Sequence, residues 1–95
     1  MRNEEVIKSF FFGCKGCKNS TKNLENIKVS NNINVLYNYN AKIAVLMYNK
    51  EDKSYYIIIN RRYLHYSKTT QKHINYIVNL CKKECMQVIY KNLCD

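Results

Sequence analysis

The chain has 95 residues and a formal net charge of +9, from 16 basic and 7 acidic side chains. This length suits a single domain (residues 1–95), because two separate cores would each be too small to outweigh chain entropy. The charge favours an anionic partner, either nucleic acid or an acidic protein surface, and excludes a DNA mimic, which carries acidic stripes. The many Asn, Lys, Ile and Tyr residues and the absence of Pro and Trp also fit an AT-rich genome, which supplies lysine without any partner.

The first residues do not resemble a signal peptide, because a brief apolar run at residues 10–12 is followed closely by lysines. We therefore expect a cytosolic protein. The longest apolar runs, residues 43–48 and 55–59, are too short to span a membrane and predict strands. In a reducing cytosol, grouped cysteines are more often metal ligands or redox groups than disulfides.

Residues 4–12 predict a short amphipathic helix, because they begin with two glutamates and space their apolar side chains three and four apart. The polar segment 14–34 predicts a loop or a weak helix. Residues 35–39, 41–48 and 55–59 are rich in β-branched and aromatic side chains, which predicts a three-stranded antiparallel meander.

From Thr70 onward, apolar positions recur every three or four residues, which predicts one long amphipathic helix toward the C-terminus. These positions are Ile74, Ile77, Val78, Cys81, Cys85, Val88, Ile89 and Leu93.

Four of the five cysteines form two closely spaced pairs. Cys14 and Cys17 have the spacing of a metal knuckle, and the only two glycines, Gly13 and Gly16, adjoin them where a tight turn needs permissive backbone angles. The second pair, residues 81 and 85, lies four apart on the expected helix, so both side chains would project from one face.

Four soft thiolates select zinc or an iron–sulfur centre over magnesium or calcium. We expect a structural Zn²⁺ bound by Cys14, Cys17, Cys81 and Cys85; an iron–sulfur centre, disulfide or redox chemistry, and unpaired core cysteines are the alternatives. Cys94 is interpreted as a free surface thiol. The expected fold class is therefore α+β, with a short N-terminal helix, a three-stranded antiparallel meander and a long C-terminal amphipathic helix, the termini being joined by the structural tetrathiolate metal site.

Residues 66–73, Tyr-Ser-Lys-Thr-Thr-Gln-Lys-His, open the expected helix, and Ser67, Thr69 or Thr70 would cap its N-terminus. The alternative is an anion site in which unpaired N–H groups, hydroxyls and nearby cations converge on a phosphate. Tyrosines interleave with these charges, as stacking surfaces do in nucleic-acid grooves. The expected partner-binding residues are Arg61, Arg62, Tyr63, Tyr66, Lys68 and Lys72.

The titratable residues show no arrangement for catalysis. His65 and His73 are the only histidines, and no set with a nucleophile and an acidic orienter is recognisable. The carboxylates likewise show no pairing typical of acid–base work. We therefore expect no enzymatic activity.

The segment 66–73 resembles a group of small, mostly uncharacterised phage and mobile-element proteins. In these, a strand reading Ser-Tyr-x-Thr-x-Ile-Ala precedes a hairpin, and Tyr-Ser-x-Thr-Thr-x-Lys-His then opens a helix. The second motif is intact here, whereas the first, residues 38–44, keeps Tyr39, Ile43 and Ala44 but has Asn and Ala in place of Ser and Thr. The resemblance covers about the middle half of the chain, with the cysteine-bearing ends as additions. It implies a phage origin and carries no agreed activity.

A small phage protein without catalytic residues most often acts by occupying a host factor, and anti-CRISPR proteins are a class that this chain resembles. The leading hypothesis is a phage-encoded, zinc-containing anti-CRISPR that binds Cas9 in the host cytoplasm and blocks DNA loading or cleavage. Its basic surface would meet an acidic protein surface, and exposed tyrosines would anchor the contact. The alternative is a basic nucleic-acid-binding accessory or regulatory protein with a structural zinc, using its Arg and Lys side chains on phosphates.

Overall fold

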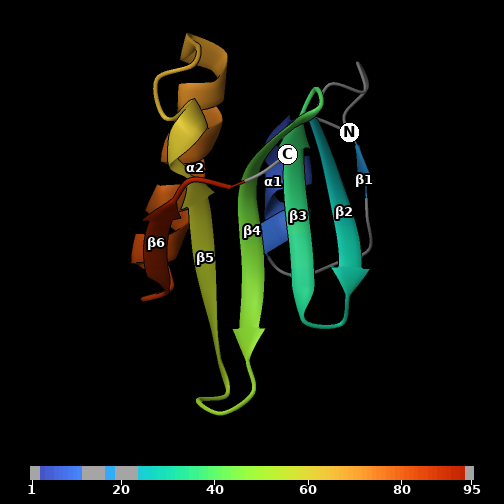
Figure 1. Ribbon diagram of the computed structural model, residues 1–95, viewed down its shortest axis with the longest axis vertical. Helices are drawn as coiled ribbons and strands as arrows, with labels where there is room; N and C mark the ends of the chain where they lie inside the picture. The colour runs from blue at the N-terminus through green and yellow to red at the C-terminus, as the bar shows by residue number, and fades with distance from the viewer. Residues whose placement is uncertain (1–2, 12–16, 19–23, 94–95) are drawn as a thin grey trace.

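The computed structural model of the chain describes residues 3–11, 17–18 and 24–93. In chain order the elements are α1 (Asn3–Phe11), β1 (Cys17–Lys18), β2 (Leu24–Ser30), β3 (Ile33–Asn38), β4 (Ala41–Asn49), β5 (Ser54–Asn60), the 3-10 turn η1 (Arg61–Tyr63), α2 (Lys68–Lys83) and β6 (Gln87–Lys91). The strands form one six-stranded sheet in sequence order (Figure 1). Neighbours from β1 to β5 are antiparallel. β6 runs parallel to β5, because α2 carries the chain back along the sheet before β6 begins.

Both helices pack on the same face of the sheet, behind the strands in Figure 1. Alternate side chains of the strands point to this face and form one core with the apolar sides of α1 and α2. The fully buried members include Phe10 of α1, Leu36 and Ile57 of the sheet, and Ile74 and Ile77 of α2. Neither helix has the length and apolarity that a membrane crossing needs.

Three buried asparagines on this face bind the sheet to the helices. Asn26 donates from Nδ2 to the hydroxyl of Ser9 at 3.3 Å, and Asn34 donates to the carbonyl of Phe10 at 3.0 Å. Asn38 donates to Oγ1 of Thr70, in α2, at 2.9 Å. A buried amide is tolerated because such a hydrogen bond offsets part of its desolvation cost.

The opposite face of the sheet is apolar as well, and neither α1 nor α2 lies over it (Figure 1). Across five adjacent strands it carries a row of directly opposed side chains: Ile27, Val35, Val45, Ile58 and Ile89. The protein is thus a sheet with both helices on one side and, on the other, an apolar row in which Val35 and Val45 are buried and Ile27 is exposed.

The expected three-stranded meander is wrong. The predicted strands are present within β3, β4 and β5, but they belong to a larger, mixed sheet. Residues 24–30, interpreted as a loop or weak helix, form β2. Asparagine favours turns, so its recurrence in this segment concealed a strand in which Asn26 points into the core.

The expected long C-terminal helix is also wrong, because α2 ends at Lys83. Cys85 adopts a left-handed backbone with φ 55°, its N–H donates to the carbonyl of Lys82 at 3.3 Å, and the N–H of Met86 donates to the carbonyl of Cys81 at 2.8 Å. This pair of bonds is a Schellman motif, which closes a helix. Residues 87–91 then pair with β5 as β6, consistent with the high strand propensity of Val, Ile and Tyr.

Candidate functional site

The start of α2 is fixed by a hydrogen-bond network centred on Thr70. Ser67 is the N-cap, and its Oγ accepts from the N–H of Thr70 at 3.1 Å. The buried Oγ1 of Thr70 accepts in turn from Ser67 Oγ at 3.0 Å and from Asn38 Nδ2 at 2.9 Å. Of the three capping candidates that the sequence offers, Ser67, Thr69 and Thr70, the structure shows Ser67 as the cap. The network ties the end of β3 to the first turn of α2.

A hollow of about 860 Å³ opens above this network. We call it the tyrosine hollow. It is lined by the β3–β4 turn (residues 38–41), by Arg62 and Tyr63 of η1, and by residues 66, 67, 69 and 70 at the start of α2. The two segments that carry the sequence resemblance, residues 38–44 and 66–73, thus meet at one place in the fold.

Two tyrosines are largely exposed at the tyrosine hollow. Tyr66 is 71% exposed, and its ring meets that of Tyr63 edge to face, with centroids 5.3 Å apart and an interplanar angle of 81°. Tyr39 is 73% exposed and sits in the two-residue turn between β3 and β4 with φ 57°. A left-handed backbone costs a residue with a Cβ about 1–2 kcal/mol, so glycine or asparagine is the usual choice in such a turn. The left-handed backbone of the exposed Tyr39 therefore lowers the stability of the fold.

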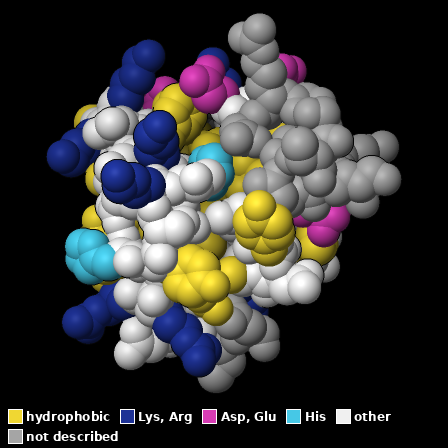
Figure 2. Space-filling view, turned by 90° about the horizontal axis from the view of Figure 1, so that it is seen from above, with side chains coloured by type: hydrophobic (Ala, Val, Ile, Leu, Met, Phe, Trp, Pro, Cys, Tyr) yellow, Lys and Arg dark blue, Asp and Glu magenta, His cyan; other side chains and the backbone are white. Residues whose placement is uncertain are grey.

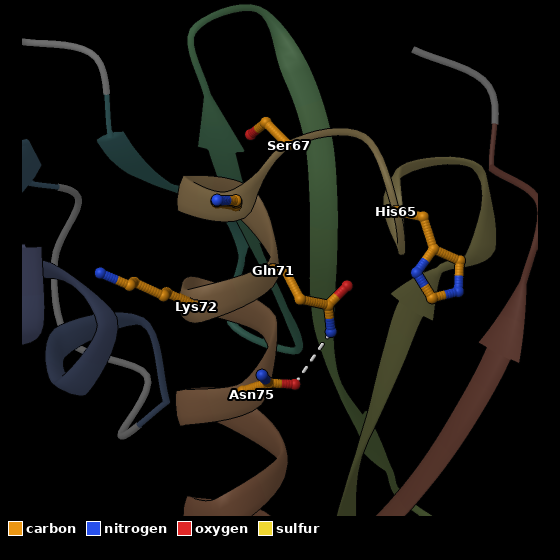
Figure 3. A pocket seen from close by; sticks show the side chains of 6 residues that line it. His65, Ser67, Gln71, Lys72 and Asn75 are labelled. Carbon is orange, nitrogen blue, oxygen red and sulfur yellow. Dashed lines mark hydrogen bonds between the residues drawn. The ribbon is translucent and has the colours of Figure 1, made fainter.

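A second hollow, which we call the lysine hollow, adjoins the first at Ser67 and has a volume of about 560 Å³. Figure 3 shows His65 on one side of it, facing the side chain of Gln71 on α2. Gln71 donates to Oδ1 of Asn75 at 2.9 Å, and Lys72 extends away from His65 on the other side of the helix (Figure 3). Because these groups do not converge on one point, the lysine hollow is a polar surface and not a compact ligand cage.

The charge around both hollows has one sign. Residues 61–72 contain four Lys and Arg residues and no Asp or Glu, and no acidic residue lines either hollow. Lys68 and Lys72 lie four apart in the first turns of α2, where the helix dipole is positive and neighbouring like charges repel. Figure 2 looks down on this end of the molecule and shows hydrophobic side chains in the middle of the face, with Lys and Arg side chains toward one side. An anion bound here would relieve the repulsion.

Comparison with protein families shows that DUF8033, a family of unknown function, matches residues 12–92. The chain belongs to this family. The match extends beyond the middle half of the chain and includes the segments with both cysteine pairs, which the resemblance had placed outside it. No curated protein and no solved structure matches the chain.

The cysteines of this family member do not lie as the sequence predicts. Cys81 is fully buried in the core, and burial raises the pKa of its thiol to about 11, which favours the protonated form over a thiolate ligand. Cys85 is exposed and lies beyond the end of α2, so the expectation that the two share one helix face is wrong.

The other half of the expected metal site lies outside the described side chains. Cys14 is not among the described residues, and for Cys17 only the backbone is described, in β1 opposite Asn26. In the part of the chain that the structure describes, no three His, Cys, Asp or Glu residues come together as metal ligands. The zinc site stays a prediction.

The structure divides the predicted partner-binding residues between the two hollows. Arg62, Tyr63 and Tyr66 line the tyrosine hollow, and Lys68 and Lys72 line the lysine hollow. Arg61 is exposed in η1 and lines neither hollow.

Sequence reasoning missed the contribution of the β3–β4 turn, namely Asn38, Tyr39 and Asn40. The available signal was the first resemblance motif, which includes these positions and retains its tyrosine. Because Asn and Ala replace the expected Ser and Thr in this motif, the sequence alone did not predict that the turn lines the site.

Proposed function

We propose that this protein binds nucleic acid through the surface formed by η1 and the first turns of α2. The observation that carries the proposal is the charge distribution: four cationic side chains, Arg61, Arg62, Lys68 and Lys72, and no carboxylate between residues 61 and 72, the segment that supplies most of both hollows. Neutralising phosphates releases bound counterions, so such a surface gains affinity for nucleic acid of any sequence. The proposal includes no catalytic step.

The aromatic side chains add a second type of contact. Tyr39, Tyr63 and Tyr66 lie at the tyrosine hollow together with Arg62, and successive bases stack on such platforms in proteins that bind single strands. The N-terminus of α2 adds backbone N–H groups and a positive dipole, which favour phosphate. Charge and stacking thus act at the same place.

A second candidate function is inhibition of a host defence protein, with Cas9 in the host cytoplasm as the proposed target. The observation that favours it is the apolar outer face of the sheet, on which Ile27 is 41% exposed. Exposed apolar surface of this kind is typical of protein interfaces. This function would use the sheet, whereas nucleic-acid binding would use the hollows.

Fluorescence anisotropy with labelled single-stranded and duplex oligonucleotides at low salt tests the proposal. We expect the protein to bind, and Lys68→Gln/Lys72→Gln to bind several-fold more weakly. The matched control is Lys50→Gln/Lys53→Gln, which removes two exposed lysines from the β4–β5 turn at the opposite end of the molecule (Figure 1). Equal loss in both variants would show non-specific charge attraction and contradict the site.

Cas9 capture and a cleavage assay distinguish the second candidate. An inhibitor should bind purified Cas9 and block DNA loading or cleavage, and Ile27→Lys on the outer sheet face should abolish this effect. If the protein blocks Cas9 and binds no oligonucleotide, the nucleic-acid proposal is wrong.

A further inference from the structure

We infer that the tyrosine hollow binds a single unpaired nucleotide of a nucleic-acid strand. This inference rests on the proposed function and names the unit that the site recognises. The hollow, at about 860 Å³, lies within the range of about 300–1,000 Å³ typical of small-ligand sites. It presents three kinds of group, one each for a phosphate, a planar ring and a hydrogen-bond donor.

The phosphate is recognised at the first turn of α2. Ser67 caps the N–H of Thr70, and its carbonyl accepts from the N–H of Gln71 at 2.9 Å. The N–H groups of Lys68 and Thr69 make no hydrogen bond within the described part of the chain. Such N–H groups at a helix start bind phosphate oxygens, and the exposed Thr69 side chain lines the hollow beside them.

The ring is recognised by the exposed tyrosines. Tyr39 and Tyr66 reach the hollow from different elements, the β3–β4 turn and the segment before α2, and both are more than two-thirds exposed. A base in a duplex has both faces covered by its neighbours, so only an unpaired base offers a face to these side chains. This geometry favours a single strand over a duplex.

The hydrogen-bond donor is recognised by Asn38. Its side chain lines the hollow but is only 6% exposed, and its Nδ2 is used on Thr70. Its Oδ1 accepts no hydrogen bond within the described residues. Because Oδ1 is an acceptor, its partner must carry a donor: a base N–H or a sugar hydroxyl supplies one, whereas a phosphodiester group, which has no P–OH, does not. The missing partner therefore fits the base or the sugar of a nucleotide and not its phosphodiester group.

The test compares two tyrosine variants with a matched control, using a labelled thymidine strand of about ten nucleotides and a duplex of the same length. Tyr39→Asn removes the ring but keeps a residue that tolerates the left-handed turn, so it should fold. Tyr66→Ser removes the second ring. The control Tyr55→Ser removes a half-exposed tyrosine from the start of β5, outside the tyrosine hollow.

We expect Tyr39→Asn and Tyr66→Ser each to weaken single-strand binding about five- to a hundred-fold, the range for loss of one stacked base. Tyr55→Ser should bind like the native protein. A mononucleotide should displace the strand at lower concentration than inorganic phosphate does.

Three outcomes would overturn the inference. If the protein binds single strands and both tyrosine variants retain native affinity, the inference fails while nucleic-acid binding stands. If inorganic phosphate displaces the strand as well as a mononucleotide does, the ring and Asn38 play no part. If the native protein binds no oligonucleotide at all, the proposed function fails together with the inference.

Discussion

Replacing Cys85 with glycine tests whether this residue closes a helix or binds a metal. In the structure Cys85 is exposed, has φ 55° and occupies the position after the helix cap at which most Schellman motifs carry glycine. The left-handed backbone costs a residue with a Cβ about 1–2 kcal/mol, whereas glycine loses about 0.5–1 kcal/mol more conformational entropy on folding. We therefore expect Cys85→Gly to raise the free energy of unfolding by about 0.5–1 kcal/mol.

Cys85→Ala is the matched control, because it removes the thiol and keeps the Cβ. Its free energy of unfolding should stay within about 0.5 kcal/mol of the native value, as for most surface substitutions. Urea unfolding followed by circular dichroism, under reducing conditions, measures both changes. In a thermal scan the gain in Cys85→Gly corresponds to a rise in Tm of about 2–8 °C for a domain of this size.

A structural zinc site predicts the opposite result. Losing one of four thiolate ligands would cost several kcal/mol, because the metal's binding energy is folding energy. Two results together would refute the conclusion that Cys85 serves only to end the helix: a decrease of more than about 2 kcal/mol in the free energy of unfolding of both variants, and one zinc ion per native chain in native mass spectrometry.

Three further predictions concern buried groups. Thr70→Val should cost about 1–3 kcal/mol in urea unfolding, because it leaves the buried Nδ2 of Asn38 without its acceptor. Burial lowers the pKa of His73 below 6.5, so the folded protein holds the imidazole in its neutral form. The unfolded chain takes up a proton on His73 as the pH falls through 6.5, so the free energy of unfolding should be highest above pH 6.5 and should decrease below it. Because burial raises the pKa of Cys81 to about 11, its thiol should react with a thiol reagent far more slowly than exposed Cys85, as mass spectrometry of the labelled chain would show.

Each of these predictions has a control. Thr69→Val alters an exposed hydroxyl next in sequence and should change stability little, so an equal loss in both variants would contradict the role of Thr70. His73→Gln should flatten the stability profile between pH 7.5 and 5.5, and an unchanged profile would assign the acid sensitivity to other groups. Equal labelling rates of the two thiols in folded protein would contradict the burial of Cys81.

The sequence predicts those elements whose local signals agree with their packing. The apolar, β-branched runs of β3, β4 and β5 are such elements, and so is the amphipathic repeat of α1. The end of α2 was missed because the left-handed residue there is Cys85 and not glycine, so the stop signal is absent from the sequence. β2 was missed because it contains Asn26, a residue type that favours turns. Its place in the core depends on a hydrogen bond to Ser9 that the sequence does not reveal.

The candidate site was predictable in part for a related reason. The basic and aromatic side chains from Arg62 to Lys72 are adjacent in sequence, and their composition indicates a binding surface without any structure. Tyr39 lies over twenty residues away and joins them only because the Asn38–Thr70 hydrogen bond connects β3 to the start of α2. Contacts of this kind depend on the sheet order, which a single sequence does not specify.

The salt dependence of single-strand binding tests the central claim most directly. If Lys68 and Lys72 contact phosphates, log Kd should rise linearly with log salt concentration, and Lys68→Gln/Lys72→Gln should reduce the slope by about 1.4–2. A native slope near zero, or a slope that the double variant leaves unchanged, would contradict nucleic-acid binding at the start of α2.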